Sequence, residues 1–103
     1  MAFNLFITQE AHDDTDTIAG YMVSELKNLA AASGFLDDVE EAYRNLKNNP
    51  HVYSLCSDAR LAAAGIRKAV IKNYLILFRL DETRQTVFVL RIVYGGRNYA
   101  DFM

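Results

Sequence analysis

The chain has 103 residues, of which 51% are hydrophobic and 23% are charged. This length and composition fit one globular domain over residues 1–103 and exclude a disordered chain. No window approaches the roughly 20 consecutive apolar residues of a membrane-spanning helix, residues 1–5 show no signal-peptide pattern, and the single cysteine, Cys56, excludes an internal disulfide and a zinc cluster. We therefore expect a cytoplasmic protein that needs no metal and no cofactor.

The net charge of −2 conceals an uneven distribution of charge along the chain. Residues 1–58 carry ten acidic and three basic side chains, whereas residues 59–103 carry three acidic and eight basic ones. A dipolar chain of this kind can present a positive surface to an anionic partner despite its acidic isoelectric point. We expect the basic half to be the working surface. The alternative is that its lysines and arginines only solvate the strands.

The N-terminal half reads as a strand followed by two helices. Residues 3–8 alternate loosely between apolar and polar and predict a short strand. Thr8 is suited to cap a helix that ends near Lys27, because acidic residues fill its first turns. Asn28 can cap a second helix, whose apolar side chains recur at helical spacing until Asn49 and Pro50 stop it. So short a break between two helices predicts an α-helical hairpin.

In the C-terminal half the apolar period changes to two. Residues 51–64 form either a loop or a short helical piece around residues 62–64, which Gly65 ends. Strands are predicted over residues 66–72, 74–81 and 85–94, with a polar turn at 81–84. Apolar residues on both faces of these strands indicate that both faces are at least partly covered. The order of strand, two helices and three strands predicts an α+β fold.

Two arginines, Arg79 and Arg91, lie inside apolar strands. A charge there must reach water, a partner or a ligand, because burying it unpaired is costly. An odd-length turn between the two strands would point both arginines to one face, and an even-length turn to opposite faces. Alternatively, each arginine pairs with a helix carboxylate such as Asp14 or Glu41. Strict alternation places Arg91 on the face of Val87, Val89 and Val93.

The end of the chain gathers arginines and tyrosines around a pair of glycines at residues 95–96. Guanidinium groups bind phosphate bidentately, and tyrosine rings stack on bases or donate an O–H. Charge on the first strand of the sheet unit adds to this set. The candidate catalytic residues are Arg67, Arg79, Arg91, Arg97, Tyr94 and Tyr99, and the candidate RNA-binding residues are Lys68 and Lys72.

A family resemblance rests on residues 65–81 and on the run Val-Leu-Arg-Ile-Val-Tyr-Gly-Gly-Arg at 89–97. Both segments resemble the C-terminal half of RelE/ParE superfamily toxins, and residues 35–42 resemble their second helix. The resemblance implies a RelE-like β-α-α-β-β-β fold, in which a two-helix hairpin packs on a twisted antiparallel sheet. It also implies the toxin of a type II toxin–antitoxin pair, held inactive by a small antitoxin that wraps it. Operator DNA would be bound only indirectly, through the antitoxin.

This family divides by target, since RelE-type members cut mRNA in the ribosomal A site and ParE-type members inhibit DNA gyrase. By position, Arg67 stands near a catalytic lysine of RelE-type enzymes, and Arg97 matches the arginine after their last strand. These matches favour ribosome-dependent cleavage of mRNA. However, Leu75 stands where RelE-type enzymes have an arginine, and Tyr99 comes too soon for their tyrosine. Gyrase inhibition therefore stays open, as does a non-toxic relative that only binds its antitoxin.

Cleavage of mRNA by its own 2′-hydroxyl needs a base, charge on the phosphorane and an acid. The arginines would supply the charge, and Tyr94 or Tyr99 would handle the protons. Neither His12 nor His51 is well placed for this work. The carboxylates of the acidic first helix either form a solvated face or bind a basic antitoxin that lies across them. Apolar residues left uncovered on the far face of the sheet would be the other anchor of this antitoxin.

Overall fold

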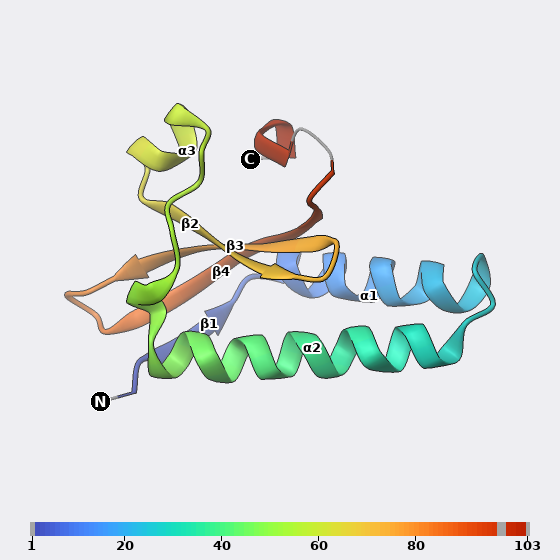
Figure 1. Cartoon of the computed structure of the whole chain (residues 1–103). Coiled ribbons are helices and arrows are strands. Elements are labelled where there is room, and N and C mark those ends of the chain that lie inside the picture. Colours follow the sequence, from blue (N-terminus) through green and yellow to red (C-terminus); the bar gives the residue numbers. More distant parts are fainter. Residues whose placement is uncertain (1, 97–98, 103) are drawn as a thin grey trace.

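The computed structural model describes residues 2–96 and 99–102. At its centre lies a four-stranded sheet with the strand order β1-β4-β3-β2. Helices α1 and α2 cover one face of this sheet, and α3 and the C-terminal turn η2 lie over the other (Figure 1). In chain order the elements are β1 (Asn4–Ile7), α1 (Gln9–Ser24), α2 (Leu29–Asn48), η1 (Pro50–Val52), α3 (Ala59–Ala63), β2 (Ile66–Ile71), β3 (Tyr74–Asp81), β4 (Thr86–Tyr94) and η2 (Tyr99–Phe102).

Capping side chains explain where the two long helices begin. The Thr8 hydroxyl accepts a hydrogen bond from the Ala11 amide at 3.2 Å, and the Asn28 side chain accepts one from the Ala31 amide at 2.9 Å. Both predicted caps are thus confirmed. Helix α1 ends at Ser24 rather than near Lys27, which adopts a left-handed φ of 54° in the connection. No helix in the described part of the chain is long and apolar enough to cross a membrane.

The sheet is antiparallel in its three C-terminal strands, as predicted. The first strand differs, because β1 pairs with β4 in parallel. Most of the chain separates these two strands, so no tight turn constrains them to run antiparallel. Strand β1 ends at Ile7, opposite Val89, and the outer edge of β4 continues beyond this point. The first turns of α1 take over that edge.

Two apolar clusters hold the layers together, one on each face of the sheet. We call the face under α1 and α2 the helix face; its buried strand residues are Ala69, Ile71, Ile76, Phe78, Val87, Val89 and Ile92. We call the opposite face the second face; its buried strand residues are Ile66, Leu75, Leu77 and Val93, and its cover contributes Cys56, Leu61 and Ala100. The prediction that both faces are covered is confirmed.

A β-bulge in β4 decides where the two mid-strand arginines point. Phe78 pairs with Val89, but the next pair joins Leu77 to Arg91, so Leu90 is an extra residue on β4. The extra residue shifts the alternation of β4 by one position. Beyond the bulge, residues of β4 therefore lie on the opposite face from the one that strict alternation predicts.

Because of this shift, Arg79 and Arg91 lie on the same face of the sheet. The loop between β3 and β4 is even, since Asp81 pairs with Thr86, and without the bulge it would have separated the two arginines. Arg79 is the direct partner of Phe88, and both belong to the second face. The prediction that Arg91 shares a face with Val87 and Val89 is wrong for this reason, although it does share one with Val93.

Candidate functional site

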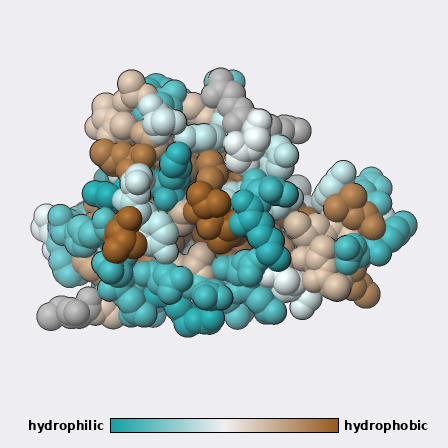
Figure 2. Space-filling model, in the orientation of Figure 1, coloured by the Kyte–Doolittle hydropathy of each residue, from teal (hydrophilic) through white to brown (hydrophobic). Residues whose placement is uncertain are grey.

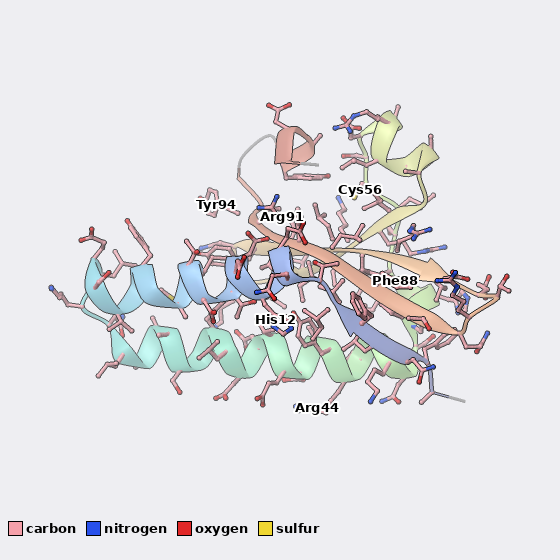
Figure 3. All side chains as sticks on the ribbon, turned by 180° about the vertical axis from the view of Figure 1, so that it is seen from behind. His12, Arg44, Cys56, Phe88, Arg91 and Tyr94 are labelled. Atoms are coloured by element: carbon pink, nitrogen blue, oxygen red, sulfur yellow. The ribbon has the colours of Figure 1, made fainter. Side chains whose placement is uncertain are left out.

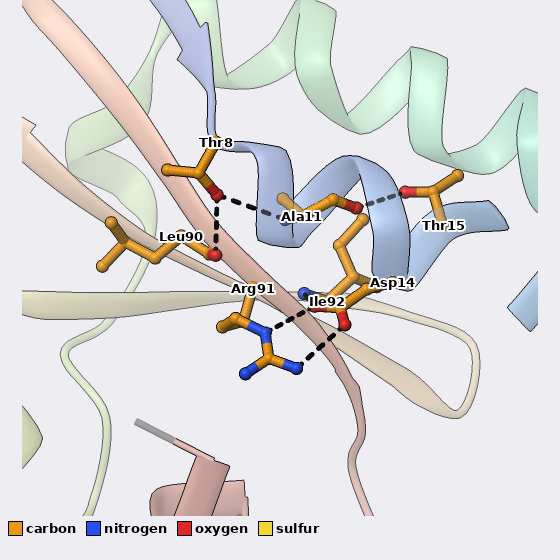
Figure 4. Close-up of polar contacts among 7 residues, drawn as sticks. All are labelled: Thr8, Ala11, Asp14, Thr15, Leu90, Arg91 and Ile92. Atoms are coloured by element: carbon orange, nitrogen blue, oxygen red, sulfur yellow. Dashed lines mark hydrogen bonds and ion pairs between the residues drawn. The ribbon is translucent and has the colours of Figure 1, made fainter. Parts of the chain in front are cut away.

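Arg91 forms an ion pair with Asp14 of α1 (Figure 4). Its Nε and Nη2 donate to the two carboxylate oxygens at 2.7 and 2.9 Å, and this bonding raises the pKa of Arg91. The same carboxylate accepts from the Ile92 amide at 2.9 Å, and the Thr8 hydroxyl donates to the Leu90 carbonyl at 2.9 Å. The start of α1 thereby supplies hydrogen-bond partners for the backbone groups of β4 that lie beyond the end of β1. The interpretation that pairs Arg91 with a helix carboxylate is confirmed.

Arg79 has a different neighbourhood, although it lies on the same face of the sheet as Arg91. It lies on β3 opposite Phe88, whereas Arg91 lies on β4 beyond the end of β1. Its guanidinium carbon lies 5.5 Å from the centre of the Phe88 ring, and the Phe6 ring of β1 lies 5.7 Å from Phe88 on the other side. Phe6 is 54% exposed. We call Phe6, Arg79 and Phe88 the aromatic patch. Its composition, an exposed arginine over a half-buried ring with an exposed ring beside it, is typical of residues that anchor a binding partner.

Arg67 points away from Arg79 and Arg91. It is the cross-strand partner of Phe78, which places it on the helix face, and its Nη1 donates to the Tyr53 carbonyl at 2.6 Å. At the position where RelE-type enzymes have an arginine, Leu75 is buried in the cluster of the second face and is 8% exposed. The candidate arginines therefore do not converge on one point. Arg97 lies outside the described residues.

The two lysines proposed to bind RNA lie in different places. Lys68 is the cross-strand partner of Leu77 and belongs to the second face. Lys72 follows β2 with a left-handed φ of 54°, and its ammonium group lies 3.1 Å from the Asp38 carboxylate of α2. Only Lys68 is thus available to a site on the second face.

Three polar groups gather where the C-terminal turn meets the second face: Lys68 of β2, Cys56, and Tyr99 of the turn itself. The Cys56 thiol is 3% exposed, and its burial raises its pKa, whereas the charge of Lys68 and a hydrogen bond with Tyr99 act in the opposite direction. Figure 3 shows Cys56 beside α3, with Arg91 near the middle of β4 and Tyr94 beyond it. The sequence reasoning missed Cys56 as a neighbour of Tyr99, because a lone cysteine carries no spacing signal.

The raised pKa of Cys56 predicts a dependence of stability on pH. From about pH 9, the ordinary value for the thiol, the unfolded chain releases this proton while the folded chain keeps it. The free energy of unfolding should therefore fall as the pH rises, by at most about 1.4 kcal/mol per pH unit for one group. Urea unfolding of the wild type and of Cys56→Ala at pH 8 and pH 10 measures this fall in the free energy of unfolding. Equal losses in both proteins would contradict the assignment.

Tyr94 and the two histidines lie apart from Lys68, Cys56 and Tyr99. Tyr94 ends β4 with its ring centre 5.9 Å from that of Tyr74. His51 pairs with Glu82 at 2.9 Å, and His12 is an exposed residue of α1. Within the described residues, no group of three His, Cys, Asp or Glu side chains could hold a metal ion.

The helical hairpin exposes apolar side chains at the end that extends past the sheet. Leu26 is 55% and Leu29 is 73% exposed there, and Figure 2 shows hydrophobic colour at this tip among hydrophilic residues. A groove of about 300 Å³ runs between α2 and β2, with Asp38 and Glu41 on its helical wall. These are features of a surface that a partner covers.

Solved structures with a similar architecture include toxins and toxin–antitoxin complexes. A structure of the RelBE2 toxin–antitoxin complex from Mycobacterium tuberculosis matches with a TM-score of 0.65 and 20% identity, over 91% of this chain and 99% of that one. The chromosomal ParDE system of P. aeruginosa matches with a TM-score of 0.72 and 20% identity, over 90% and 96%. A variant of the E. coli toxin RelE in the free state matches with a TM-score of 0.65 and 10% identity, over 99% and 93%.

The family model described as the ParE toxin of the type II toxin–antitoxin system parDE matches residues 5–99. The chain therefore belongs to this family, and it is a type II toxin of the RelE/ParE superfamily. No curated protein matches its sequence closely enough to count as a relative. At these identities the solved structures support the shared fold, which is the RelE-like fold that the sequence predicts.

Proposed function

We propose that this toxin, when free of its antitoxin in the cytoplasm, arrests growth by binding DNA gyrase and inhibiting it. The observation that carries the proposal is the dispersal of the candidate catalytic residues. Arg67 is on the helix face, Arg91 is paired with Asp14, and Leu75 occupies a buried apolar position. Such an arrangement suits a binding surface better than a site for proton transfer and charge stabilisation at one phosphate. The match to the ParE family model supports the same choice.

Supercoiling of relaxed plasmid by purified gyrase tests this proposal. Adding the free toxin at micromolar concentration should block supercoiling, while cellular mRNA stays intact after the toxin is induced. Arg97→Ala should abolish growth arrest and raise the concentration needed to block supercoiling at least tenfold, because it removes a guanidinium from the tail. Arg84→Ala, in the exposed loop between β3 and β4, is the matched control. A toxic Arg97→Ala variant would contradict the role of Arg97.

Cleavage of ribosome-bound mRNA is the second candidate, and one observation favours it. Lys68, Tyr99 and the Cys56 thiol lie together on the second face, so a cation and a phenol are near one another. Primer extension on cellular mRNA after induction separates the candidates. New 5′ ends within translated frames would select cleavage. Growth arrest with intact transcripts would select gyrase, and absence of arrest would select a non-toxic relative.

We further propose that a cognate antitoxin keeps the toxin inactive by covering the helical hairpin and part of the sheet. Acidic residues line α1 and α2, and exposed leucines mark the hairpin tip. A basic, amphipathic antitoxin segment would complement both features. Operator DNA would then be bound through the antitoxin, because the toxin's own basic residues are spread over both faces of its sheet.

A further inference from the structure

The C-terminal turn η2 rests on the second face of the sheet, beside α3 (Figure 1). It is only four residues long, yet Ala100 is 6% exposed and belongs to the same cluster as Leu61 of α3. This short segment therefore has a defined docking position. The chain that leads to it from β4 passes through Gly95 and Gly96, which restrict the backbone less than other residues do.

Two contacts join described residues of this segment to the rest of the protein. The Nη2 of Arg60, in α3, donates to the Ala100 carbonyl at 2.5 Å. The ring of Tyr99 packs against the cluster that contains Cys56. The methyl group of Ala100 buries little apolar area, so a hydrogen bond from a charged donor adds to the packing of Ala100 and Tyr99 in holding the segment.

Helix α3 is built in a way that fixes Arg60. The Asp58 side chain caps the helix by accepting from the Leu61 amide at 3.0 Å, and Leu61 is 1% exposed on the sheet. With the cap on one side and the buried leucine on the other, Arg60 is held between two anchored residues. From the sequence alone, residues 51–64 could form either a loop or a short helical piece, so no role was predicted for Arg60.

We propose that Arg60 is a positioning residue of the toxin, which docks the C-terminal segment on the second face through its bond to the Ala100 carbonyl. The docked segment holds Tyr99 against the second face. This inference deepens the proposed function and rests on it, because it takes the C-terminal part of the chain to contact the target. It adds that α3 acts on toxicity without touching the target.

The Cys56 thiol can report on docking, since it is buried in the cluster that Ala100 joins and against which Tyr99 packs. In the purified free toxin, labelling of Cys56 by a soluble aromatic disulfide at pH 8 should be slow, because the thiol is buried and its pKa is raised. Arg60→Met keeps the aliphatic stem and removes the donors, and it should speed labelling about tenfold. Arg60→Lys should restore part of the protection, because an ammonium group can still donate. Arg44→Met, on α2 away from this face (Figure 3), should change nothing.

The same variants are then compared for growth arrest without antitoxin and for inhibition of supercoiling. Arg60→Met should need about ten times more protein to block supercoiling and should arrest growth weakly, with a melting temperature close to that of the wild type. Unchanged labelling in Arg60→Met would overturn the docking role. Faster labelling with undiminished growth arrest would overturn the link between docking and toxicity.

Failure of the proposed target would look different from failure of this inference. A wild type that arrests growth but leaves gyrase active would reject gyrase as the target, and the comparison of growth arrest would still decide the role of Arg60. A wild type that does not arrest growth would overturn both the proposed function and the inference.

Discussion

Replacing Asp14 by alanine should lower the free energy of unfolding by about 3 kcal/mol. Removing one partner of a buried ion pair costs about 3–5 kcal/mol, because the favourable interaction of the two charges is lost while the desolvation cost of the remaining charge stays. The pair here is partly accessible, with side-chain exposures of 27% for Arg91 and 16% for Asp14, so the lower end of that range applies. The substitution also deprives the Ile92 amide of its acceptor.

Urea unfolding followed by circular dichroism measures this loss, with an unchanged dependence on denaturant as the sign of a two-state change. Asp13→Ala is the matched control, since Asp13 is an exposed neighbour in the same helix and should cost at most about 0.5 kcal/mol. A double-mutant cycle with Arg91→Met should give a coupling energy of about 2 kcal/mol. Equal losses for Asp14→Ala and Asp13→Ala would show that the ion pair does not stabilise the fold.

The ion pair also shows what kind of site prediction the sequence supports. An arginine in the middle of an apolar strand needs a partner on physical grounds, and the acidic first helix offered several carboxylates. That reasoning named Asp14 as a possible partner of Arg91, and the structure places them 2.7 Å apart. It could not decide that Arg79 would instead lie against Phe88, because the neighbours of each arginine depend both on the face of the sheet on which it lies and on its distance from the start of α1.

The face on which Arg91 lies depends on the bulge at Leu90, and no residue near this bulge marks it in the sequence. Bulges are often marked by glycine, but the residues from Thr86 to Tyr94 are all compatible with a regular strand. The extra residue is visible only when β3 and β4 are paired. Periodicity and capping, by contrast, are local properties, and they gave α2 and its cap at Asn28 correctly.

Contacts between residues far apart in sequence explain most of the remaining differences. The bond of Arg60 to Ala100 spans 40 residues, and that of Arg67 to Tyr53 spans 14 residues across a segment without clear periodicity. The parallel pairing of β1 with β4 is likewise set by the path of the helical hairpin rather than by a turn. The proximity of Lys68, Cys56 and Tyr99 on the second face could therefore be found only after the fold was known.

Among the phenylalanines whose burial the structure describes, Phe78 should be the most destabilising to replace by alanine, with a loss of about 4 kcal/mol. Phe78 is 0% exposed in the cluster between the sheet and the helices, and its ring meets the Tyr53 ring at 90° with centres 5.7 Å apart. Truncating such a residue removes its burial and leaves a cavity, which together cost about 3–5 kcal/mol. A domain of this size has a total stability of about 5–15 kcal/mol, so a substantial part of it would be lost.

Phe6→Ala provides the matched control, because the same atoms are removed from a side chain that is 54% exposed. Its cost should stay below about 1 kcal/mol, which urea unfolding of both variants can resolve. The antitoxin should partly rescue Phe78→Ala, since a partner that binds only the folded state raises its apparent stability. Equal losses for the two variants would contradict the arrangement of the helix face. Reduced gyrase inhibition by Phe6→Ala at nearly wild-type stability would identify the aromatic patch as part of the surface that meets the target.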